Sequence, residues 1–143
     1  MQRAQAIQLV HDMVDRINSN RRNADEYLVE GELAAAGEPE DCTAAATQPA
    51  RDLCEWTNLL RGVASAEGSA RLGSVMGARG CIGRLTDASG TAIDRAYVVA
   101  VAWQGLVPTA APANGCGLNQ FDAESKRRVY AYTVRIANLA QVP

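Results

Sequence analysis

The sequence is poor in histidine and in aromatic side chains, and it has no long apolar run. Of its 143 residues, one is histidine and 5% are aromatic. The longest uninterrupted apolar stretch, 96–103, is far shorter than the roughly 20 residues that a membrane-spanning helix needs. The formal charge is −2 and no basic run is present, so nothing in the sequence indicates nucleic-acid binding.

The sequence also lacks the residue patterns that are typical of enzymes. No G-x-S-x-G pattern surrounds a serine, and the glycine-rich stretch 73–83 has neither the P-loop lysine nor a G-x-G-x-x-G fingerprint. His11 lies close to Asp12 and Asp15, and a histidine beside carboxylates can transfer protons. However, Asp15 is one helical turn away on an exposed face, where such pairs are common. We therefore expect no enzyme activity, no catalytic residue and no cofactor.

Cysteine is present in a pattern that suits disulfides better than a metal. The four cysteines are separated by 12, 27 and 35 positions, and no two form a C-x-x-C motif. With one histidine in the chain, a zinc site would need mainly thiolates at spacings that suit zinc poorly. We expect two disulfides and an oxidising compartment, with three connectivities open. The cysteines are Cys42, Cys54, Cys81 and Cys116.

The first twenty residues predict an amphipathic helix. No capping residue precedes it, because Met1, Gln2 and Arg3 offer no side-chain acceptor of the preferred kinds. We therefore expect the helix to be the truncated end of a longer one. Its apolar residues recur three and four positions apart, which predicts a single packing face. Together with Ala6, that face consists of Ile7, Val10, Met13, Val14 and Ile17.

A second helix and an acidic segment follow. Residues 25–41 carry seven acidic side chains and no basic one, which predicts an irregular surface loop with a short helical piece over 27–36. Thr47 and Pro49 then mark the start of a helix that fades over 62–68. Its expected apolar stripe contains Leu53, Trp56, Leu59, Leu60 and Val63.

The second half of the chain predicts strands. Alternation indicates strands over 81–86, 96–105 and 127–139, with a turn at 87–90 and a loop at 108–117. Helices first and antiparallel strands afterwards indicate an α+β domain. We expect Trp56 to be in the core, whereas Trp103 could lie in the core or anchor a binding surface.

Five motifs occur along the chain in one order. The first is AQAIQLVHDMVDRINSNR at 4–21, followed by ARDLCEW at 50–56, GARGCI at 77–82 and VAVAWQGL at 99–106. RRVY at 127–130 with VRIA at 134–137 closes the series. In this order they resemble the PilV-type minor pilins, the type IV pilus modification proteins.

The resemblance implies the type IV pilin fold, in which the C-terminal half of a long helix lies across an antiparallel sheet. Residues 1–143 would be one soluble ectodomain, with the helix at 1–20 and a globular head at 21–143. In the family a hydrophobic helix precedes this part and anchors the subunit in the inner membrane, with the head in the periplasm. After assembly the subunit becomes part of the extracellular pilus.

The resemblance also implies a function. Family members are non-enzymatic structural subunits that take part in priming pilus assembly, in a minor pilin complex at the pilus tip, and so affect cell adhesion and twitching motility. The implied partners are other minor pilins, the major pilin and a tip adhesin. Two alternatives stay open: a minor pseudopilin of a type II secretion system, which a calcium site would favour, and a secreted adhesin-like domain that binds a surface ligand.

Two further expectations concern the head. We expect the disulfides Cys42–Cys54 and Cys81–Cys116, which would join the acidic segment to the second helix and the first strand to the loop before the last strand. We expect contacts between heads to use surface loops, at 27–41 and 108–121, because loops on rigid scaffolds often carry binding roles.

Overall fold

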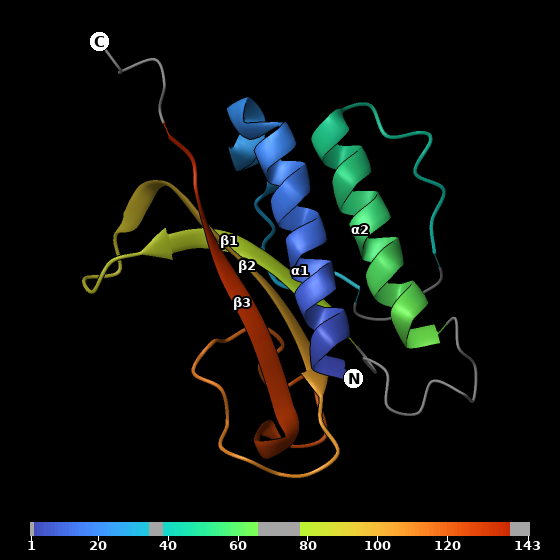
Figure 1. Cartoon of the computed structure of the whole chain (residues 1–143), viewed down its shortest axis with the longest axis vertical. Helices are drawn as coiled ribbons and strands as arrows, with labels where there is room; N and C mark the ends of the chain where they lie inside the picture. The colour runs from blue at the N-terminus through green and yellow to red at the C-terminus, as the bar shows by residue number, and fades with distance from the viewer. Residues whose placement is uncertain (1, 35–38, 66–77, 138–143) are drawn as a thin grey trace.

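Two helices pack with one antiparallel sheet in the computed structural model, which describes residues 2–34, 39–65 and 78–137 (Figure 1). The helices are α1 (Gln2–Ser19) and α2 (Gln48–Ser65), and the strands are β1 (Arg79–Thr86), β2 (Ala92–Gln104) and β3 (Arg127–Arg135). Two short 3-10 helices, η1 (Arg21–Tyr27) and η3 (Glu124–Lys126), complete the described elements. α1 lies across one face of the sheet, and α2 lies beside α1. The expected α+β class is confirmed.

The strand order is β1-β2-β3, and both pairings are antiparallel. Ala100 in the central strand lies opposite Cys81 on one side and Ala131 on the other. The turn expected at 87–90 is present: the Asp87 carboxylate accepts hydrogen bonds from the backbone N–H groups of Ser89 and Thr91. Gly90 has a φ of +87°, a conformation that suits glycine.

The strand limits differ from those expected. β1 begins two residues before Cys81, and β2 begins at Ala92 rather than at residue 96. The added part of β2 mixes apolar with charged residues and is exposed or half-buried, and a register shift against β1 separates it from the regular pairing. It therefore lacks the apolar run that marks the buried section. β3 ends at Arg135, and residues 138 and 139 of its expected end lie outside the described residues.

The main core lies between the helices and the near face of the sheet. Both tryptophans are buried: Trp56 is fully enclosed, and Trp103 is 3% exposed, so Trp103 is a core residue and not an open anchor. A Cβ on Gly80 would lie 2.5 Å from the Trp56 ring, so the close approach of α2 to β1 requires glycine there. The core residues of the strands include Ile82, Tyr97, Val99, Val101, Trp103 and Val134.

The expected stripe of α2 is wrong at Leu59, which is 39% exposed. Trp56 and Leu60 are one turn apart and face α1 and β1, whereas Leu59 is rotated by about 100° from Leu60. Asp52 and Thr57 are buried instead. The side chain of Val63 and the glycine-rich residues 73–77 lie outside the described residues.

The helical piece expected over 27–36 is absent from 28–34, and residues 35 and 36 lie outside the described residues. Residues 28–33 instead follow the outer edge of β1. Val29 donates to the Ile82 carbonyl at 3.0 Å, and Leu33 and Gly80 exchange hydrogen bonds of 2.8 and 3.1 Å. The pairing satisfies backbone groups on this edge of the sheet, a demand that local sequence does not reveal.

Candidate functional site

The expected packing face of α1 is turned inward. Val10, Met13 and Ile17 are fully buried, Val14 is 6% exposed and Ile7 is half-buried. Leu9, which the stripe did not include, is also buried. α1 packs against both the sheet and α2, so it buries a wider stripe than one neighbour would require. The Trp56 indole N–H donates to the Leu9 carbonyl at 2.7 Å, which fixes α2 against α1.

A charged cluster joins the polar side of α1 to α2. The Arg16 guanidinium lies 2.5 Å from Asp12, 3.0 Å from Asp52 and 2.7 Å from Glu55. Although burial disfavours its charged form, hydrogen bonds to Asp12 and Glu55 raise the pKa of Arg16. Arg16 and Asp12 lie outside the apolar stripe expected for the helix, and the cluster shows that α2 covers part of that polar side.

Two buried tyrosines extend these polar contacts into η1. The Tyr27 hydroxyl donates to the Asp52 carboxylate, and the Tyr97 hydroxyl donates to Asp25. Burial, followed by the carboxylate partner, raises the pKa of each tyrosine to about 12. The hydrogen bond from Tyr97 in turn lowers the pKa of Asp25. Both hydroxyls are therefore neutral donors that hold η1 against the core.

The cysteines form the disulfides Cys42–Cys54 and Cys81–Cys116, the two pairs expected from the sequence. The first ties the segment before α2 to α2 itself. The second ties β1 to the loop between β2 and β3. Loop-closure entropy suggests that they stabilise the fold by about 3 and about 4 kcal/mol.

A buried arginine organises the loop between β2 and β3. Arg127 is 1% exposed and forms an ion pair of 3.0 Å with Glu124. Its guanidinium also donates to the carbonyls of Asn114 at 2.6 Å, Cys116 at 2.7 Å and Pro112 at 3.2 Å. Arg127 appeared in the sequence only within a motif, because a buried role for an arginine has no local signature. It fixes the conformation of the loop that the second disulfide anchors.

This loop displays apolar side chains to solvent. Leu106 is 77% exposed, Val107 is 64% exposed and Leu118 is 49% exposed. Large apolar side chains on a loop with a fixed conformation are typical of contact surfaces. The N-terminal end of α1 and this loop lie at the same end of the molecule (Figure 1).

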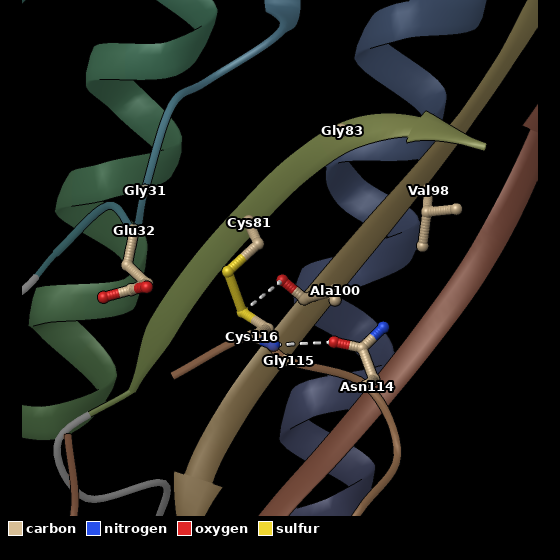
Figure 2. A pocket seen from close by; sticks show the side chains of 9 residues that line it. All are labelled: Gly31, Glu32, Cys81, Gly83, Val98, Ala100, Asn114, Gly115 and Cys116. Carbon is tan, nitrogen blue, oxygen red and sulfur yellow. Dashed lines mark hydrogen bonds between the residues drawn. A yellow bond between two sulfur atoms is a disulfide. The ribbon is translucent and has the colours of Figure 1, made fainter. Parts of the chain in front are cut away.

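A hollow of about 280 Å³ lies on the face of the sheet away from the helices, beside the Cys81–Cys116 disulfide (Figure 2). Glycine, alanine and valine residues of β1, β2 and the adjoining loops form much of its lining. Asn114 accepts a hydrogen bond of 2.8 Å from the Cys116 N–H, and Glu32 is the one ionisable side chain among the lining residues, since the cysteines are bonded. A single carboxylate provides no acid–base pair, so the hollow contains no recognisable catalytic arrangement.

His11 does not lie on the exposed face on which the sequence placed it beside Asp15. Its Nε2 atom is 3.3 Å from the Tyr130 hydroxyl, and its ring centre lies 4.8 Å from that of Tyr132. β3 packs alongside α1, a tertiary contact that helical spacing cannot predict. His11 packs against β3 and has no carboxylate partner among the described residues.

The described part of the chain contains no group of three or more side chains suited to hold a metal ion. None of its helices is long and apolar enough to cross a membrane. Comparisons with protein-family models, with curated proteins and with solved structures found no match.

Proposed function

We propose that this chain is the ectodomain of a PilV-type minor pilin, a structural subunit of the type IV pilus without catalytic activity. The main support for the proposal is the position of α1, which lies across an antiparallel sheet and buries its apolar face against it. The five ordered motifs that resemble the family support it. Two disulfides, which suit a periplasmic or extracellular protein, support it as well.

The proposed mechanism is association. In the resembling family, α1 continues a hydrophobic helix that anchors the subunit in the inner membrane and later packs in the pilus core. The head then contacts neighbouring heads from the side. A subunit of this kind would join other minor pilins in a complex that primes assembly and remains at the pilus tip, where it would affect adhesion and twitching motility.

The loop between β2 and β3 is the best candidate for contacts between heads. Arg127 and the Cys81–Cys116 disulfide fix its conformation, so little conformational entropy is lost when it binds. Leu118 gives this loop an apolar anchor. Glu32 lines the same hollow as Asn114 and Cys116 of this loop, so the acidic segment could supply polar contacts beside it.

Co-purification with candidate minor pilin heads tests this function. The tagged chain should recover at least one such head, and Leu118→Ser should reduce recovery about tenfold. Leu59→Ser, a similarly exposed leucine on α2, is the matched control and should leave recovery unchanged. Failure to recover any head, together with tight binding of the chain to an abiotic or cellular surface, would favour an independent adhesin-like domain instead.

A further inference from the structure

The two outer edges of the sheet differ. Residues 28–33 cover the edge of β1 with backbone hydrogen bonds to Gly80 and Ile82. β3 is the other edge strand, and among the described residues no backbone hydrogen bond reaches its outer side between Val129 and Arg135. An open edge of this length is a template for a further strand.

Along β3, backbone N–H and C=O groups point alternately toward β2 and away from it, and only the outward groups can bind a further strand. Ile136 donates to the Arg95 carbonyl, and Gly105 donates to the Lys126 carbonyl. Even-numbered residues of β3 therefore bond to β2, and the odd-numbered residues direct their N–H and C=O groups outward. The outward groups belong to Val129, Ala131, Thr133 and Arg135, all in regular pairing with β2.

The side chains around this edge are basic and aromatic. β3 contains no carboxylate, and Arg128 and Arg135 lie near its two ends. On the helix side, the Arg3 guanidinium lies 5.8 Å from the ring centre of Tyr130, and Tyr132 is 43% exposed. Among the described residues, Arg3, Arg128 and Arg135 form no ion pair. The Arg128 guanidinium donates to the carbonyls of Ser125, Arg127 and Val107, so Arg3 and Arg135 are the cations available to a partner.

The charge selects the partner. Two copies paired through β3 would bring no acidic side chain to this edge, because β3 contains none. A strand with acidic side chains would instead find complementary charge together with unused backbone donors and acceptors. The exposed Tyr132 would add apolar contact area beside it.

We propose that the outer edge of β3 (residues 129–135) binds an extended acidic segment of a partner protein as a fourth strand of the sheet. The outward backbone groups of Val129, Ala131 and Thr133 form the ladder, and Arg3 and Arg135 select acidic side chains. This mode of recognition is β-strand addition. The inference uses neither the motifs nor the proposed pilus function, so each can fail without the other.

Titration with a capped synthetic decapeptide of alternating glutamate and valine tests the proposal on the full 143-residue chain. Amide NMR should show shifts centred on residues 129–135 and slower hydrogen exchange at Val129, Ala131 and Thr133. Binding should weaken at least tenfold between 50 and 500 mM salt, because screening weakens exposed charge pairs. A peptide with lysine in place of glutamate should not bind.

Ala131→Pro removes one outward N–H group and leaves the ladder with β2 intact, since proline is tolerated on the open side of edge strands. It should weaken binding at least tenfold, whereas Ala131→Val should not. If the proline variant unfolds, a glutamate–valine peptide N-methylated at alternate residues replaces it and should not bind the unchanged chain. Equal binding of the N-methylated peptide, shifts confined to another surface, or pairing of two copies through β3 would each overturn the proposal.

Discussion

At the scale of single residues, buried polar side chains stabilise the fold through contacts that the sequence does not reveal. Arg127 is charged and lies at a strand start, where exposure is the ordinary expectation, yet it is enclosed by three carbonyls and Glu124. Cysteines are different, because four of them in a small domain can form only a few disulfide pairings. The paired cysteines could therefore be anticipated from the sequence, whereas the role of Arg127 could not.

Arg127→Met should destabilise the protein by about 2–4 kcal/mol, because it leaves the carbonyls of Asn114 and Cys116 without a charged donor. Urea denaturation followed by circular dichroism measures the loss as a lower midpoint. Arg135→Met, at an exposed position on the same strand, is the control and should change little. Equal midpoints for the two variants would show that Arg127 does not clamp the loop.

The buried tyrosines predict a response to alkaline pH. The pKa of Tyr27 and of Tyr97 is raised from 10.0 to about 12, so the folded state keeps a proton that the unfolded state loses. Their contribution to stability is therefore complete below pH 10 and is lost as the pH rises to about 12. Thermal melts across this range should show a falling midpoint, with a shallower fall in Tyr27→Phe. An identical pH dependence in that variant would contradict the assigned role of Tyr27.

At the scale of elements, hydrophobic periodicity predicts an element well when one of its faces is buried. It is misleading when the element packs against a segment that is distant in sequence. The packing face of α1 and the buried section of β2 could be predicted from the sequence, because buried positions repeat regularly along both elements. The pairing of residues 28–33 with β1 was not readable, because it depends on strand edges about 50 residues away in sequence. The predictions for Leu59 and His11 were wrong for a related reason. Residue spacing shows which side of a helix a side chain occupies, but it does not show how many other elements pack against that helix.

The buried face of α1 can be tested with one charge. Val14→Asp places a carboxylate at a position that is 6% exposed, among side chains of the main core. We expect a loss of several kcal/mol and a melting temperature lower by roughly 10 °C or more. Asn18→Asp introduces the same charge on the exposed side of the same helix and should have little effect. A melting curve unchanged by Val14→Asp would show that α1 does not pack on the sheet in solution.

At the scale of the whole molecule, the described part of the chain has two distinct ends and a sheet with two distinct edges. The N-terminal end of α1 and the fixed loop with its exposed leucines lie at the same end (Figure 1). Among the described residues, one sheet edge is covered, and the other edge is open and its strand carries no carboxylate. The α+β class followed from the order of the elements. The difference between the edges arises only in the assembled sheet, so no local pattern could have predicted it.

The central claim is that the chain belongs to a minor pilin needed to prime pilus assembly. Its most direct test is a count of surface pili by electron microscopy after the encoding gene is deleted, with the full-length gene restored as control. We predict that the deletion strain has few pili and that restoration returns the normal number. A normal count of pili in the deletion strain would contradict the account.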